Sequence, residues 1–115
     1  MTHEHIDYKV LSDLREVMED GYLQLLETFL EDSELRLSQL HLAKDAQTLG
    51  MAAHSFKGSS SNMGAVGLAQ LCQQLEERVR QQPLYGIEDL INRIDLEFVE
   101  VQRFYRGECE RIAAG

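Results

Sequence analysis

The chain has 115 residues, 43% of them hydrophobic and 27% charged, which is the composition of an ordinary globular protein with one core. Its formal net charge of −9 disfavours nucleic acid, because that binding depends on Lys and Arg neutralising phosphates. No run of about 18 apolar residues exists to span a membrane. We expect a single domain over residues 1–115, monomeric, with neither nucleic acid nor membrane as a partner.

The N-terminus and the cysteines add to this expectation. Residues 1–5 lack the basic and then apolar segments of a secretory signal. The two cysteines, Cys72 and Cys109, are far apart in the sequence and give no disulfide framework. A cytoplasmic location is therefore expected, and because the domain fills a chain that starts with Met, we expect it to be free-standing.

Apolar residues recur at spacings of three, four and seven along the first third of the chain, which predicts helices. A short helix over residues 8–18 is capped by Asp7 and ended by Gly21. Its expected apolar side is Val10, Leu11, Leu14, Val17 and Met18. A longer helix over residues 22–43 has Leu23, Leu26, Phe29, Leu30, Leu37 and Leu40 on one side and an acidic, solvated face on the other.

Three more helices are expected in the remainder. Asp45 caps a helix that ends near Gly64, and the next covers residues 65–82 with Leu68, Leu71, Cys72, Leu75 and Val79 as its stripe. Residues 82–86 form a turn, and the last helix runs from 87 to at least 105, with Gly107 expected to interrupt it before a polar tail. Short turns favour antiparallel neighbours. The predicted fold is all-α: an up-down-up-down four-helix bundle with the short N-terminal helix over one end.

We expect His54 on the outer side of the third predicted helix, the one that begins after Asp45. With about 100° between successive helical residues, Leu49, Ala52, Ala53, Phe56, Ser60 and Met63 form an apolar stripe. His54 points roughly 160° away from Phe56. Gln47, Gly50, Gly58 and Ser61 share its face, and Lys57 lies beside it. We therefore expect His54 to face solvent among small or polar neighbours.

A lone histidine is usually a satisfied core residue or an idle surface residue, and the sequence holds one argument against each alternative. The helix phase opposes the first alternative. Gly58 opposes the second, because a mid-helix glycine costs about 1 kcal/mol relative to alanine and leaves the imidazole open to a bulky partner. The Lys57 ammonium, one turn away, can neutralise an anion attached to the ring. An open imidazole beside a cation suggests a phosphoryl acceptor.

A longer motif surrounds these residues. Residues 53–65 read AHSFKGSSSNMGA, and Leu68, Leu71, Cys72, Leu75 and Glu76 follow at helical spacing. This pattern resembles the histidine-containing phosphotransfer (HPt) domain, over about 25 residues at motif level. Phe56 and Met63 stand where the family more often has Leu, which are apolar core replacements. The helical layout of nearly the whole chain agrees with the family's four-helix bundle.

The resemblance implies a phosphorelay intermediate. His54 would accept a phosphoryl group on Nε2 from a receiver-domain aspartate of a hybrid sensor kinase, and pass it to the aspartate of a response regulator. Lys57 would neutralise the phosphoryl charge and Gly58 would give clearance. Gln47, Gly50, Met51 and Ser61 are candidate docking residues. Phosphoryl transfer depends on positioning and charge neutralisation, so Mg²⁺ is expected only in the receiver partner.

No other chemistry is supported by the residues. No P-loop or nucleotide loop is present, so no cofactor and no autonomous kinase or phosphatase activity are expected. We expect no general base beside His54, so that a phosphohistidine would survive until its next partner arrives. A bundle that only binds partners remains the alternative, whereas no nucleophile, base and oxyanion site for a hydrolase can be assembled. Cys72 is expected in the core, and His3, Glu4 and His5 lack a third ligand at motif spacing for a metal.

Overall fold

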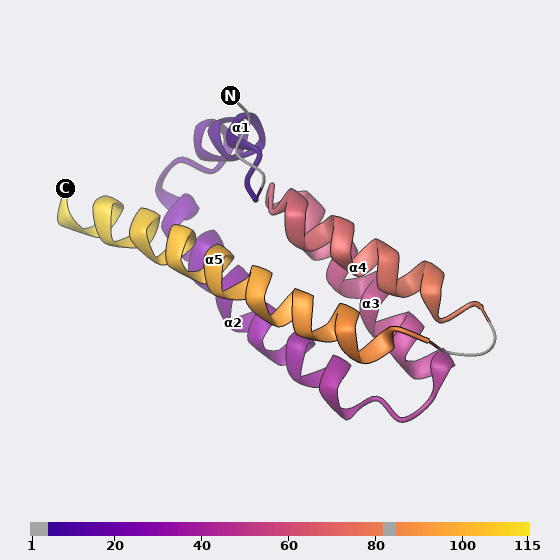
Figure 1. Ribbon diagram of the computed structural model, residues 1–115. Coiled ribbons are helices and arrows are strands. Elements are labelled where there is room, and N and C mark those ends of the chain that lie inside the picture. The colour runs from indigo at the N-terminus through magenta and orange to yellow at the C-terminus, as the bar shows by residue number, and fades with distance from the viewer. Residues whose placement is uncertain (1–4, 82–84) are drawn as a thin grey trace.

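The computed structural model describes residues 5–81 and 85–115, which form five α-helices and one 3₁₀ turn and, within these residues, no strand (Figure 1). The elements are α1 (Tyr8–Met18), η1 (Glu19–Gly21), α2 (Tyr22–Leu42), α3 (Ala46–Asn62), α4 (Val66–Arg78) and α5 (Ile87–Ala114). The side chain of Asp7 caps α1 and that of Asp45 caps α3, as predicted. Among the described residues, none of the helices is both long and apolar enough to cross a membrane.

The four long helices form the predicted antiparallel bundle. Helix α3 packs against α2 and α4, and α5 packs against α2 and α4, so each long helix has two neighbours. The α3–α4 pair has the most extensive contact. Figure 1 shows α1 lying across one end of the bundle, the end at which α5 finishes. The expected fold class is confirmed.

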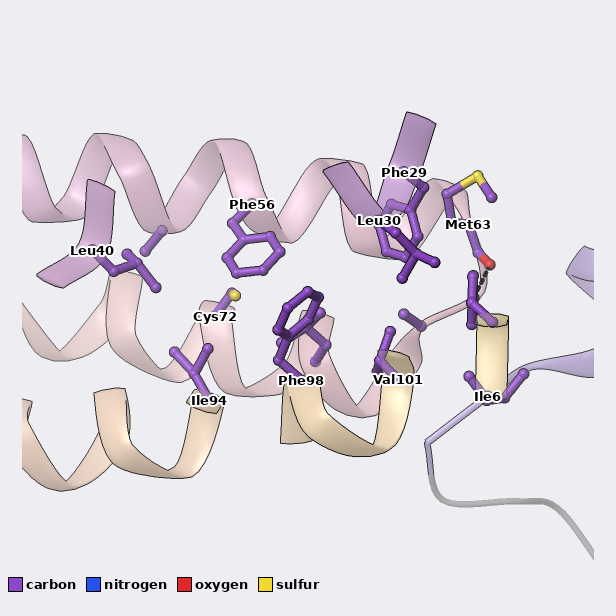
Figure 2. Packing of buried hydrophobic residues seen from close by; sticks show 14 of the residues in the cluster. Ile6, Phe29, Leu30, Leu40, Phe56, Met63, Cys72, Ile94, Phe98 and Val101 are labelled. Atoms are coloured by element: carbon purple, nitrogen blue, oxygen red, sulfur yellow. Dashed lines mark hydrogen bonds between the residues drawn. The ribbon is translucent and has the colours of Figure 1, made fainter. Parts of the chain in front are cut away.

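The core lies between the four long helices. Figure 2 shows Phe56, Cys72 and Phe98 converging on its centre from α3, α4 and α5. All three side chains are almost fully buried, as are Leu26, Leu40, Leu68, Leu75, Ile94 and Val101. The Tyr105 hydroxyl donates a hydrogen bond of 2.5 Å to the Met63 carbonyl, which joins α5 to the end of α3. The predicted stripes of α2 to α5 are therefore the surfaces that meet.

Residues 5–7, which directly precede α1, are fixed to the bundle. Ile6 is fully buried, and the Asp7 amide donates to the Gly64 carbonyl at 2.7 Å. Gly64 has φ of +79°, and a Cβ there would lie 2.9 Å from the Asp7 carbonyl oxygen, so glycine suits this position. His5 Nδ1 also lies 2.5 Å from Glu97 Oε2 of α5.

The apolar side expected for α1 is only partly correct. Leu11 is buried, but Val17 is 77% exposed and Met18 is exposed as well. The reason is geometric: α1 lies across the end of the bundle, where it contacts the start of α2, instead of lying in a groove between two helices. Amphipathic spacing indicates which side of a helix is apolar, but not how much of it a neighbour covers.

Two helix ends differ from the sequence-based expectation. Helix α4 ends at Arg78 rather than at residue 82, and residues 82–84 of the expected turn lie outside the described residues. Gly107 does not interrupt α5, which continues to Ala114. The helix tolerates this glycine because Tyr105 before it and Cys109 and Ile112 after it pack against the core. Cys109 is therefore part of a packed helix and not of a polar tail.

Candidate functional site

The His54 side chain stands on the outside of α3, as its helical phase predicted. It is 66% exposed, whereas Ala53 and Phe56, which face the core, are fully buried. The extensive contact between α3 and α4 fixes the rotation of α3 about its own axis, and this rotation places His54 outside. His54 is therefore neither a core histidine nor covered by the described part of the chain.

The imidazole is not isolated, because a carboxylate from α4 reaches it. His54 Nδ1 lies 2.7 Å from Glu76 Oε2, and Lys57 Nζ donates a hydrogen bond of 2.7 Å to Glu76 Oε1. Arg80, in the turn directly after α4, places Nη2 3.5 Å from Glu76 Oε2. The Glu76 side chain is only 11% exposed. One nearly buried carboxylate thus connects the candidate acceptor to two cations.

These contacts determine the protonation state of the carboxylate. The hydrogen bond from Lys57 lowers the pKa of Glu76 below its usual value, and the contact with His54 acts in the same direction against the opposing effect of burial. An ionised carboxylate only accepts hydrogen bonds, so in the neutral ring the proton resides on Nδ1. The other ring nitrogen, Nε2, then has its lone pair free.

The sequence-based expectation of no general base beside His54 did not anticipate the Glu76 carboxylate, which lies against the ring. Lys57 is not the one cation at this carboxylate among the described residues, because Arg80 also contacts it. The sequence contained one signal for Glu76: it lies four residues after Cys72 and directly after Leu75, on the apolar stripe of α4. A charged residue in an apolar stripe needs a partner across the helix interface.

Gly58 and Lys57 occupy the positions that the sequence predicted. A Cβ built on Gly58 would meet no described atom within 4 Å, so the absence of a side chain leaves open space one turn from His54. Lys57 is 29% exposed and is turned toward α4 by its ion pair with Glu76. On the other side of His54, the Arg36 guanidinium of α2 donates a hydrogen bond to the Ser55 hydroxyl.

A groove of about 490 Å³ between α3 and α4 leads to the imidazole. Its lining residues are Ala46, Gln47, Gly50, Met51 and His54 of α3, Glu76 of α4, and Val79 and Arg80, which directly follow α4. Three of the four candidate docking residues therefore lie together, and Met51 is 67% exposed. Ser61 is exposed but does not line this groove.

Gly50 has a structural role besides lining the groove. A Cβ at this position would lie 3.1 Å from Val79 Cγ2, which is tighter than ordinary van der Waals contact. The missing side chain therefore allows α3 and α4 to approach each other closely. This approach is what brings the Glu76 carboxylate within reach of His54.

The other reactive side chains lie outside this cluster. Cys72 is fully buried, and burial raises the pKa of its thiol to about 12, so it is a core residue as expected. Within residues 5–81 and 85–115, no three His, Cys, Asp or Glu side chains are grouped as a metal site requires. His3 and Glu4 lie outside the described residues.

An antiparallel helical bundle that exposes one imidazole beside a lysine and a bare glycine defines a histidine phosphotransfer module. Residues 24–104 match the Hpt domain family, and this chain belongs to it. The chain is 49% identical to histidine-containing phosphotransfer protein B of Pseudomonas aeruginosa PAO1, whose crystal structure matches with a TM-score of 0.92 over 96% of this chain and 98% of that one.

A curated relative extends the comparison to a plant. Histidine-containing phosphotransfer protein 2 of Arabidopsis thaliana is 25% identical over 118 residues, which cover 90% of this chain and 76% of that protein. The family and these relatives support a phosphotransfer intermediate of a phosphorelay, and the family implies interaction with receiver domains.

Proposed function

We propose that His54 accepts a phosphoryl group from the aspartyl phosphate of a receiver domain in a hybrid sensor kinase and passes it to the aspartate of a response regulator. One observation carries this proposal: the His54 ring is exposed while its Nδ1 is bound to an ionised Glu76. That contact leaves Nε2 as the nucleophile and fixes the orientation of the ring toward a partner.

In the accepting step, the Nε2 lone pair attacks phosphorus, the bond between phosphorus and the receiver's aspartyl oxygen breaks, and the aspartate leaves as a carboxylate. The ring keeps its Nδ1 proton and becomes positively charged as the bond forms. Glu76 Oε2, 2.7 Å away, stabilises that charge. The passing step reverses these changes on a second receiver, so the same contact serves both directions.

The remaining residues supply charge and access. Lys57 neutralises the phosphoryl group, and the open space above Gly58 admits the receiver. The groove that contains Gln47, Gly50 and Met51 is the proposed docking surface, and Mg²⁺ comes with the receiver partner. Ser61 stays a candidate docking residue at the far end of α3.

The phosphohistidine should persist between partners, for a different reason from the one that the sequence suggested. A carboxylate is present, but Glu76 Oε1 accepts from Lys57 and Oε2 lies against His54 and Arg80. With His54 at Oε2 and a cation, Lys57 or Arg80, held against the carboxylate, Glu76 is not free to activate a water molecule. We therefore propose a carrier without phosphatase or kinase activity of its own.

The direct test is to incubate the chain with a phosphorylated receiver domain and follow the label. We expect an acid-labile, base-stable label that is lost in His54→Gln. His41→Gln is a matched control, because His41 is also exposed and its Nε2 lies 2.8 Å from the Asp95 carboxylate. A wild-type chain that stays unlabelled, yet still binds the receiver, would favour the alternative of a bundle that only binds.

Lys57→Ala tests the role of the ammonium. We expect transfer to slow by roughly ten-fold, because charge neutralisation is a main term in phosphoryl transfer, while the helical circular dichroism stays unchanged. Lys9→Ala removes the same charge from α1, where Lys9 pairs with Asp13 far from the site. An unchanged rate in Lys57→Ala would remove Lys57 from the mechanism.

A further inference from the structure

In the structure, Lys57 is bound by an anion of its own chain. Its ammonium lies 2.7 Å from Glu76 Oε1, and the side chain is only 29% exposed. A phosphoryl group on His54 Nε2 would compete with Glu76 for this cation. Neutralising that group therefore requires Lys57 to leave Glu76, at least in part.

The departure of Lys57 would leave Glu76 short of a partner. The carboxylate is 11% exposed, so water replaces a lost partner incompletely, and a nearly buried unpaired charge is costly. His54 Nδ1 would still occupy Oε2, but Oε1 would have no donor. Some other group has to satisfy the carboxylate if Lys57 is to move easily.

Arg80 is placed to be that group. It lies in the turn that follows α4, four residues after Glu76, with Nη2 3.5 Å from Oε2, and its side chain is 73% exposed and hence free to adjust. A guanidinium presents several donors in a planar fork and can engage both oxygens of a carboxylate. At 3.5 Å the contact is loose, so a closer one remains available when Lys57 leaves.

We propose that Arg80 is a positioning residue that takes over the Glu76 carboxylate when Lys57 moves to the phosphoryl group. This inference rests on the proposed function of His54. Arg80 then acts on the transfer rate through Glu76 and Lys57, without touching the phosphoryl group itself. Glu76 is thus paired mainly with Lys57 before phosphorylation of His54 and mainly with Arg80 after it.

The test is a double-mutant cycle between Arg80 and Lys57, read by single-turnover transfer from a phosphorylated receiver. We expect Arg80→Ala to lower the maximal rate roughly three- to five-fold, as for a partly exposed ion pair, and Arg80→Lys to restore part of it. The receiver concentration at half-maximal rate should change little. In a Lys57→Ala background, Arg80→Ala should have no further effect, because no cation then needs releasing.

Arg103→Ala is the matched control, because Arg103 is 72% exposed and pairs with Glu100 on α5. It should leave the maximal rate unchanged. If Arg80 only holds Glu76 against His54, Arg80→Ala should lower the maximal rate as much or more in the Lys57→Ala background. That result would overturn this inference but not the proposed function of His54. If Arg80→Ala raises only the receiver concentration at half-maximal rate and leaves the maximal rate unchanged, Arg80 belongs to the docking surface, and that result would also overturn the inference. A wild-type chain that takes no label would overturn the proposed function and this inference together.

Discussion

Glu76→Gln is the most informative single substitution at the site. The two side chains have nearly the same size, so the packing between α3 and α4 is preserved. The amide has no charge and has one acceptor oxygen, yet Glu76 serves two donors, His54 Nδ1 and Lys57 Nζ. If the amide oxygen turns to Lys57, its NH₂ faces Nδ1. The ring proton then moves to Nε2, where it blocks the nucleophile.

The size of the effect follows from the geometry. Two unit charges about 4 Å apart interact by about 1 kcal/mol in water and about 4 kcal/mol at a protein surface of intermediate dielectric. His54 is 66% exposed, so the interaction of Glu76 with the cationic ring lies in the lower part of this range. A loss of about 1–2 kcal/mol corresponds to a rate roughly 5- to 30-fold lower.

Two measurements check this prediction. Single-turnover transfer from a labelled receiver gives the rate, and nitrogen NMR of the histidine ring gives the fraction of neutral His54 protonated at Nε2, which should rise. Glu77→Gln is the matched control, because Glu77 is the next residue on α4, is exposed and accepts a side-chain hydrogen bond from Gln73 rather than from the His54 site. A Glu76→Gln variant with the wild-type rate and an unchanged ring tautomer would refute the role of Glu76.

Three further predictions concern access, backbone and burial. Gly58→Leu should lower transfer at least roughly ten-fold and raise the melting temperature slightly, since the space is open and leucine is the better helix former; retained transfer would contradict the clearance argument. Gly107→Ala should raise the free energy of unfolding by up to about 1 kcal/mol. Gly64→Ala should lower it by about 1–2 kcal/mol, because Gly64 has a φ of +79° and a Cβ there would crowd the Asp7 carbonyl oxygen. Denaturant titration measures both changes, and equal effects would contradict the special role of glycine at position 64. The pKa of Cys72, raised by burial to about 12 from 9.0, means that the folded protein keeps this proton while the unfolded chain loses it above pH 9. Its contribution to stability is therefore complete below pH 9 and falls by about 1 kcal/mol by pH 10, so the stability advantage of the wild type over Cys72→Ala should shrink over that interval, and a constant difference would contradict it.

The sequence alone determined most of the helices and the direction of His54. Helical hydrogen bonds and stripes are local, so the spacing of Phe56, Ala53 and their neighbours was enough to place the imidazole outside. The caps at Asp7 and Asp45 are equally local. Where local signals misled, as at Gly107, packing against the rest of the core outweighed the preference of one residue.

Only the tertiary structure decided what surrounds the ring. Glu76 is 22 residues from His54 in the sequence, and their contact depends on the rotation of α4 and on its close approach at Gly50. Helical periodicity gives the direction of a side chain about its own axis, but not its distance from a side chain on another helix. The groove, the engaged carboxylate and the position of Arg80 arise from that packing, because ion pairs between helices form only after the helices have met.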